Sequence, residues 1–423
     1  MNSNQRLRAR IILGCIGAAA CGLALSLSSV QLIHGDDYAA KAHKQYVKPI
    51  SALLDRGTIF FASKDGSHPA AATLSNTFLV YMNPTLIKDP VGTYQALSQY
   101  LTIDEAQFIK KAALTEDPYE ELAKKVDASV AQSVKSLSLA GISVSKENIR
   151  SYPGMTLAAH TLGLIGEQDG VIKGRYGLES SYENILSRPS TGSNANIFAQ
   201  LFTGIHDSVF SDSSAAHGDI VTTIEPSVQA YLEKILAKTT AQWKPDEIGG
   251  IIMDPHTGEV VAMASLPSFD PNDTSKVKNA GVFSNPLVEN SYEMGSIMKP
   301  LTVATGLDSG AITPTSTYDD TGTMTLSGKK ISNFDGKARG IVPVQEILSQ
   351  SLNVGAATVA LKVGKDTFGT YFSSFGFGSK TGIDQPNETS GLAANLKTGR
   401  DIEIATMAYG QGIALSPIAI TRA

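Results

Sequence analysis

Ser296 and Lys299 are the two side chains whose types and spacing best fit nucleophilic catalysis. A serine and a lysine three positions apart share one face of a helix, so the lysine amine can accept the serine proton. The residues between them, Ile297 and Met298, are apolar, and an apolar run follows. Burial among such residues lowers the pKa of a lysine, as a general base at neutral pH requires. The alternative is that Ser296 only begins a structural helix.

The Ser-x-x-Lys pattern is common, and its surroundings decide which copy is relevant. It occurs four times in the sequence, the other copies being Ser143/Lys146, Ser275/Lys278 and Ser327/Lys330. Those three lie among polar residues or glycine, which is typical of solvated segments in which a lysine stays charged. Gly295, just before Ser296, permits a tight entry into a helix whose free backbone N–H groups can stabilise an oxyanion.

Ser351 and Asn353 form a second polar pair, expected in a short break between two helical segments, 344–350 and 354–363. They make the only Ser-x-Asn pattern in the sequence. A hydroxyl and an amide on such a turn could relay a proton and bind a substrate carbonyl. The alternative is that Asn353 is the N-cap of the second helix, a position at which asparagine is favoured.

The composition argues against several other classes of function. The chain has 423 residues, 42% of them hydrophobic, with 35 Lys and Arg against 40 Asp and Glu. This length predicts two or three folded domains, and the mildly acidic balance argues against a nucleic-acid partner. Two cysteines and seven scattered histidines, without an H-E-x-x-H pair, predict no metal site and no cofactor.

The N-terminus predicts a membrane anchor. Arg6, Arg8 and Arg10 precede an uncharged stretch over 11–33, which is long enough to span a bilayer. By the positive-inside rule the arginines face the cytoplasm, so the rest of the chain is expected outside the cell membrane, held by a single span. The alternative is a cleavable export signal, with Ala18–Ala20 at its cleavage site.

Beyond the anchor, the pattern predicts two folded regions separated near 186–217, a stretch rich in Ser, Gly and Asn. Before it, residues 93–138 carry apolar positions at helical spacing. After it, Pro226 opens a helix that reaches about Ala241, and 249–264 is a β-hairpin around an Asp-Pro-His-Thr-Gly turn. Strand, helix, hairpin and further helices indicate an α+β fold, a largely antiparallel sheet with helices packed on it.

Together these residues resemble the class B penicillin-binding proteins. Tyr292–Pro300 is similar to the active-serine motif YEPGS-x-x-K, with Met294 where proline is commoner, and Ser351–Asn353 is similar to the S-x-N motif. Further segments are similar to family motifs along most of the chain, namely Arg56–Ile59, Arg150–Pro153, Gly177–Glu179, Asp254–Ser265 and Tyr409–Gly412. The D-R-N-G that usually follows the first of these is degraded to Phe61–Gly66.

The resemblance implies a peptidoglycan D,D-transpeptidase that β-lactams would acylate. Ser296 would attack the D-Ala–D-Ala carbonyl of a stem peptide, with neutral Lys299 as the proton acceptor. Ser351 would help return a proton to the leaving D-Ala, and Asn353 would bind the substrate amide. An amine of a neighbouring stem peptide would then take the acyl group and form the cross-link.

The family also needs a Lys-Thr-Gly motif carried on a strand. The tripeptide occurs at Lys380–Gly382 and again at 397–399, and the copy at Lys380–Gly382 lies among Gly and Pro residues typical of a loop and resembles a different family segment. We therefore expect the catalytic copy beyond Ala423, so that the transpeptidase domain is truncated in this sequence. Ser416 and Pro417 fit the N-cap and first position of a helix. Only six residues follow, ending at Ala423, too few for a helix that is stable alone, which agrees with this expectation.

The resemblance divides the chain into a cytoplasmic tail over 1–10, the anchor over 11–33, a pedestal (dimerisation) domain over 34–217 and a transpeptidase domain over 218–423. A role in cell division fits the pedestal motifs better than one in elongation, and it implies a polytopic glycosyltransferase partner in the membrane. Two alternatives stay open. One is an inactive fragment or scaffold that lacks the third motif. The other is a serine β-lactamase or β-lactam sensor, which the large pedestal disfavours.

Overall fold

The structure, a computed structural model, describes residues 55–114, 117, 119–168, 171–187, 218–398 and 400–423. Within these residues the chain forms two compact units, one made of 75–149 and the other of 55–74 together with 150–423. The predicted anchor over 11–33 and most of the predicted boundary over 186–217 lie outside the described residues. No helix of the described part is both long and apolar enough to cross a membrane.

The first unit consists of strands paired with β2 and of helices packed against them. Its elements are β2 (Ala70–Met82, which begins in the second unit), η2 (Pro84–Leu86), α3 (Pro90–Leu97), α4 (Glu105–Ala112), β3 (Glu120–Val126), α5 (Ala128–Ser136) and β4 (Ile142–Ser151). β2 pairs antiparallel with β3, Phe78 opposite Val126, and also pairs with β4. Val80, Leu97 and Phe108 belong to the buried core of this unit.

The helical prediction for 93–138 is correct for α4 and α5 but wrong for 120–126. That segment is the strand β3, which stands at the end of the strand order. Its Glu and Lys side chains suggested the exposed face of a helix, but charged side chains are also the usual protection of an edge strand. Pairing with β2, which is distant in the sequence, overrides the local pattern.

The second unit begins with short elements around β1. β1 (Ile59–Phe60) pairs antiparallel with β2 and parallel with β7 (Ile220–Val221). The neighbouring elements are α6 (Ala159–Leu162), β5 (Ile165–Gln168), β6 (Val171–Gly174), α7 (Gly177–Ser181) and α8 (Glu183–Leu186). Buried apolar side chains of these segments, including Ile59, Leu162 and Leu178, form a common core.

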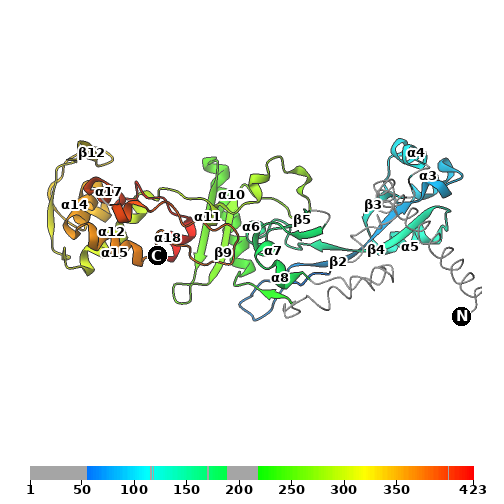
Figure 1. The fold of residues 1–423 in the computed structure, drawn as a ribbon, viewed down its shortest axis with the longest axis horizontal. Helices are drawn as coiled ribbons and strands as arrows, with labels where there is room; N and C mark the ends of the chain where they lie inside the picture. Colours follow the sequence, from blue (N-terminus) through cyan, green and yellow to red (C-terminus); the bar gives the residue numbers. More distant parts are fainter. Residues whose placement is uncertain (1–54, 115–116, 118, 169–170, 188–217, 399) are drawn as a thin grey trace, which may run out of the picture. The chain divides into compact units, whose positions relative to one another are not determined.

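The β-hairpin predicted over 249–264 is confirmed. β8 (Ile248–Met253) and β9 (Val260–Leu266) pair antiparallel, with Ile251 opposite Met263. α10 (Pro226–Trp243), whose predicted start at Pro226 is also confirmed, packs against the hairpin, as Figure 1 shows in green. The side chain of Gln229 fixes this packing, because its amide accepts from the Met263 N–H at 2.8 Å and donates to the Met263 carbonyl at 2.9 Å.

A cluster of helices completes the second unit. The elements of the second unit that follow the hairpin are η3 (Thr274–Lys276), η4 (Ala280–Phe283), α11 (Pro286–Glu289), η5 (Gly295–Met298), α12 (Lys299–Asp308), β10 (Thr317–Asp320), β11 (Thr323–Leu326), β12 (Lys329–Ser332), β13 (Gly340–Pro343), α13 (Glu346–Ser349), α14 (Asn353–Val363), α15 (Lys365–Ser374), α16 (Asn395–Thr398), α17 (Asp401–Met407) and α18 (Pro417–Arg422). Figure 1 shows α12, α14, α15 and α17 gathered together, and Met298, Ala357, Phe372 and Met407 lie in the core between them. Sheets and helices both contribute to the unit, so the mixed α and β character predicted from the sequence is confirmed.

Candidate active site

The turn before Ser296 is made possible by Gly295. This glycine has a φ of +61°, a left-handed conformation that side chains rarely adopt. It opens the 3-10 helix η5, and α12 continues directly from Lys299. Met298, fully buried in the helical core, anchors the turn from inside, while Ser296 lies on the exposed side. The sequence expectation of a tight entry into a helix at Ser296 is therefore correct.

Ser296, Lys299 and Ser351 meet in a closed triangle of hydrogen bonds. The Nζ of Lys299 lies 3.1 Å from the Oγ of Ser296 and 2.9 Å from the Oγ of Ser351. The third side joins the two hydroxyl oxygens, which are 2.9 Å apart. Lys299 also donates to the backbone carbonyl of Ser351 at 2.6 Å. Segments more than fifty residues apart in the sequence thus place three reactive groups within hydrogen-bond distance of one another.

The electrostatic environment of Lys299 suits a neutral amine. The residue is 1% exposed, and burial lowers its pKa from 10.5 to about 8. Within the described residues no carboxylate forms an ion pair with it, and only burial shifts its pKa. A neutral amine keeps two N–H groups, which match the carbonyl and the hydroxyl of Ser351, and its lone pair can then face the hydroxyl proton of Ser296.

Ser351 occupies a strained backbone position that directs both of its oxygens at Lys299. Its φ is +53°, in the left-handed region that non-glycine residues seldom occupy. The residue stands in the predicted break, because α13 ends at Ser349 and α14 begins at Asn353. Strain of this kind persists where the surrounding structure fixes it and often marks functional positions.

Asn353 is not the N-cap of α14, so that alternative reading is wrong. The N-cap is Leu352, and the side chain of Asn353 instead donates through Nδ2 to the Ser332 carbonyl at 2.9 Å. This bond ties the start of α14 to the end of β12. The remaining amide oxygen, Oδ1, is an acceptor that a substrate N–H could use.

Asn333 and Asp320, which sequence reasoning missed, support the same helix start. The Nδ2 of Asn333 donates to both carboxylate oxygens of Asp320, at 2.8 and 2.9 Å, and its Oδ1 accepts from the Val354 N–H at 3.1 Å. Asp320 is fully buried and Asn333 nearly so. Polar residues in a segment of short strands and turns are usually exposed, so the sequence carried no signal for this pair.

The loop prediction for Lys380–Gly382 is confirmed. The tripeptide lies outside any strand, after α15. The carboxylate of Glu388, which is 7% exposed, accepts from the backbone N–H groups of Thr381 and Gly382 at 2.5 and 3.0 Å. These two amides are therefore occupied by a side chain of the same loop and are not available to a substrate carboxylate.

The buried carboxylate of Glu179 joins three segments that resemble family motifs, namely Arg56–Ile59, Arg150–Pro153 and Gly177–Glu179 itself. Its two oxygens accept from the guanidinium groups of Arg56 at 2.5 Å and Arg150 at 2.6 Å. Arg56 also pairs with Glu183 at 2.7 Å, and Arg150 donates to the Gly57 carbonyl at 2.7 Å. Burial opposes the charge of Arg56, but the carboxylates outweigh it and raise the pKa of the guanidinium. This Arg56–Arg150–Glu179 group is a charge cluster that links distant segments of the second unit.

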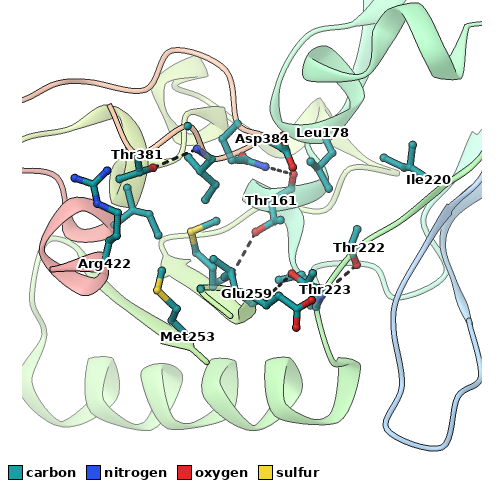
Figure 2. A pocket seen from close by; sticks show the side chains of 18 of the residues that line it. Thr161, Leu178, Ile220, Thr222, Thr223, Met253, Glu259, Thr381, Asp384 and Arg422 are labelled. Carbon is teal, nitrogen blue, oxygen red and sulfur yellow. Dashed lines mark hydrogen bonds between the residues drawn. The ribbon is translucent and has the colours of Figure 1, made fainter. Parts of the chain in front are cut away.

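A pocket lies apart from the triangle. It has a volume of about 400 Å³ and is lined by the β8–β9 hairpin, the segment around Ile220 and the loop 381–385, including Glu259 and Asp384 (Figure 2). None of the four candidate site residues lines it. Within the described residues, no group of three or more His, Cys, Asp or Glu side chains could hold a metal ion.

Comparison with protein families accounts for most of the described chain. Residues 55–196 match the penicillin-binding protein dimerisation domain, and residues 248–423 match the penicillin-binding protein transpeptidase domain. The two matches follow each other in order and together take up about three quarters of the sequence. The chain belongs to the class B penicillin-binding proteins. The transpeptidase match of this penicillin-binding protein contains all four candidate site residues, Ser296, Lys299, Ser351 and Asn353.

The similar proteins agree with this membership and include an FtsI. This penicillin-binding protein is 27% identical over 402 residues to stage V sporulation protein D of Bacillus subtilis, covering 93% of the chain and 60% of the relative. It is 27% identical over 423 residues to the peptidoglycan D,D-transpeptidase FtsI of Escherichia coli, covering 98% and 69%. Penicillin-binding protein 2X from Streptococcus thermophilus shares the fold, with a TM-score of 0.67 at 20% identity. The match covers 87% of this chain and 57% of the Streptococcus chain, so the sequence spans well under the full length of some relatives.

Proposed function

We propose that this protein is a peptidoglycan D,D-transpeptidase that works through a serine acyl-enzyme. The observation that carries the proposal is the triangle of Ser296, Lys299 and Ser351, in which a buried lysine with a pKa of about 8 touches a serine hydroxyl. The family membership and the relative named as a peptidoglycan D,D-transpeptidase support the same activity. About a tenth of such a lysine is neutral at pH 7, which is enough to serve as a general base.

In the proposed acylation step, the Oγ of Ser296 attacks the carbonyl carbon of the penultimate D-Ala while its proton passes to the neutral amine of Lys299. Helix η5 begins at this turn, so the Ser296 N–H is free to stabilise the developing oxyanion. When the tetrahedral intermediate collapses, the bond to the terminal D-Ala breaks. The leaving amine takes a proton that Lys299 returns through the hydroxyl of Ser351.

In the proposed transfer step, the amine of a neighbouring stem peptide attacks the ester carbonyl. The attacking amine loses one proton to Lys299, and Lys299 then passes that proton to the Oγ of Ser296, which leaves as a hydroxyl. Asn353 holds the donor peptide through its free Oδ1, because its Nδ2 is engaged with the Ser332 carbonyl. β-Lactams acylate Ser296 by the same first step, but their ring-opened product keeps the leaving group attached.

The proposal places the protein at the cell membrane. Residues 1–10 form the cytoplasmic tail, 11–33 a single membrane span, 34–217 the pedestal and 218–423 the transpeptidase domain, outside the membrane. The proposed role is in cell division, with a polytopic glycosyltransferase as the partner that supplies the glycan strands. The FtsI-like relatives support this role.

The experiment that tests the activity is acylation by a labelled penicillin, followed by mass spectrometry of the peptides. We expect one adduct, on Ser296, and release of D-Ala when the protein is given a stem pentapeptide. Ser296→Ala removes the adduct. Ser275→Ala is the matched control, because it changes the serine of another Ser-x-x-Lys pattern that lies in an exposed segment.

Each outcome of this experiment has a distinct meaning. An adduct that survives Ser296→Ala, or none on the wild-type protein, contradicts the proposal. An adduct on Ser296 that is hydrolysed within seconds would identify a β-lactamase instead of a transpeptidase.

A further inference from the structure

The segment 408–415 runs beside the turn that carries Ser296 and bonds to it at successive points. Tyr292 and Leu415 exchange two backbone hydrogen bonds, both of 2.9 Å. Further along, the Gly295 N–H donates to the Gly410 carbonyl at 3.1 Å. The contacts follow the two segments in opposite directions, as in an antiparallel pair.

Side chains add two further bonds to this pairing. The Oε1 of Glu293 accepts from the Gly412 N–H at 2.6 Å, although the Glu293 side chain is exposed. On the far side of the serine, the Thr302 hydroxyl donates to the Ala408 carbonyl at 2.8 Å, and this bond is buried. The residues on both sides of Ser296 are therefore held by one segment, while the Ser296 hydroxyl itself is left to Lys299 and Ser351.

Gly410 makes the closest approach in this pairing. Its φ is +79°, and a Cβ added there would lie 2.2 Å from the Gly295 carbonyl oxygen and 2.4 Å from the Gly295 nitrogen. Contacts of this length do not occur, and both atoms are backbone, so the turn itself would have to move. Because Gly295 directly precedes Ser296, any such shift is passed to the nucleophile.

We propose that the segment 409–412 positions the nucleophile, with Gly410 and Glu293 as positioning residues that fix where the Oγ of Ser296 lies relative to Lys299. The inference rests on the proposed function, because it concerns the acylation of Ser296. Neither residue touches the reacting groups. Their effect comes from geometry, since a misplacement of about 1 Å can reduce a rate by about 100-fold.

The first test compares Gly410→Ala with Gly258→Ala in the full chain. Gly258, in the β8–β9 turn, is a matched control because its φ is +78° while no atom lies within 4 Å of an added Cβ. Both substitutions impose the same backbone strain, but only Gly410→Ala collides with Gly295. We expect the acylation rate constant for labelled penicillin to fall about 100-fold in Gly410→Ala, with the dissociation constant of the initial complex little changed. Gly258→Ala is expected to keep the wild-type rate.

The second test uses Glu293 and does not depend on how well Gly410→Ala folds. Glu293→Ala removes the acceptor for the Gly412 N–H and should slow acylation about tenfold, whereas Glu293→Gln keeps an acceptor oxygen and should restore most of the rate. The midpoint of the pH–rate profile, set by Lys299, should not move in any of these variants.

Equal rates for Gly410→Ala and Gly258→Ala would overturn the positioning role while the proposed activity still stood. A Glu293→Gln variant as slow as Glu293→Ala would also overturn it. If the wild-type protein forms no adduct, the proposed function fails first, and this inference fails with it.

Discussion

Arg56 and Lys299 are both cations buried in the second unit, at 3% and 1% exposure, but their partners differ. Arg56 and Arg150 share the carboxylate of Glu179, and the carboxylates raise the pKa of Arg56. Among the residues that the structure describes, Lys299 has only neutral oxygens as partners, and burial lowers its pKa to about 8. The paired cation stays charged and links segments of the chain. Lys299, which has no carboxylate partner among the described residues, has a pKa close to neutral pH and loses its proton readily.

The difference separates a structural site from a chemical one. Guanidinium groups remain protonated at any physiological pH, so the Arg56–Arg150–Glu179 cluster can only bind and orient. A lysine amine loses its charge when its surroundings favour the neutral form. Burial favours the neutral form at Lys299, and no carboxylate of the described residues opposes it. Placing an unpaired lysine in the interior costs stability, which proteins tolerate at functional sites.

The largest expected effect is on chemistry, from Lys299→Met. Removing the base should slow acylation of Ser296 by a labelled penicillin by about 10⁴-fold, measured as the second-order rate constant. Lys299→Arg should be equally slow, because a guanidinium cannot accept the serine proton. Lys278→Met, in the exposed Ser275/Lys278 pattern, is the control and should be unaffected. Substantial activity in Lys299→Met would make Lys299 a structural cation like Arg56.

The next largest effect is on stability, from Glu179→Gln. The substitution keeps the shape but removes the carboxylate that Arg150 pairs with and leaves Arg56 with Glu183 alone, so we expect the free energy of unfolding to fall by about 3–5 kcal/mol. Denaturant unfolding measures the change. Asp273→Asn breaks an exposed pair with Lys276 and serves as the control, for which no measurable loss is expected. A Glu179→Gln protein as stable as the control variant would show that the cluster is not needed to hold these segments.

The smallest expected effect has the opposite sign, a gain of stability in Lys299→Met. At pH 7 the lowered pKa corresponds to an unfavourable burial of about 3 kcal/mol, part of which is offset by the lost hydrogen bonds to Ser351. We expect a net gain of about 1–2 kcal/mol in the free energy of unfolding. Between pH 8 and 10.5 the unfolded chain binds more protons than the folded one, so wild-type stability rises with pH and the gain shrinks. Destabilisation at pH 7 would contradict this assignment.

Local patterns in the sequence predicted much of the fold and the first pair of site residues. The β8–β9 hairpin and the start of α10 at Pro226 follow from turn and capping chemistry, which is local. The Ser296–Lys299 contact follows from helical spacing for the same reason. The loop character of Lys380–Gly382 was also evident from its Gly and Pro neighbours.

Features that depend on distant contacts could not be predicted in the same way. β3 was mistaken for helix because its pairing with β2 is invisible in its own residues. The bond between Asn333 and Asp320, and the meeting of Arg56 with Glu179 across 123 positions, exist only in the folded chain. The left-handed conformation of Ser351 is likewise imposed by its surroundings, since serine has no intrinsic preference for it.

The pH dependence of Ser296 acylation tests the central claim most directly, that Lys299 is a buried base without a counter-charge. The second-order rate constant with labelled penicillin should rise about tenfold per pH unit at low pH and level off above an apparent pKa of about 8. A rate that is independent of pH between 6 and 9 would contradict the claim. So would one that keeps rising to the ordinary lysine pKa of about 10.4.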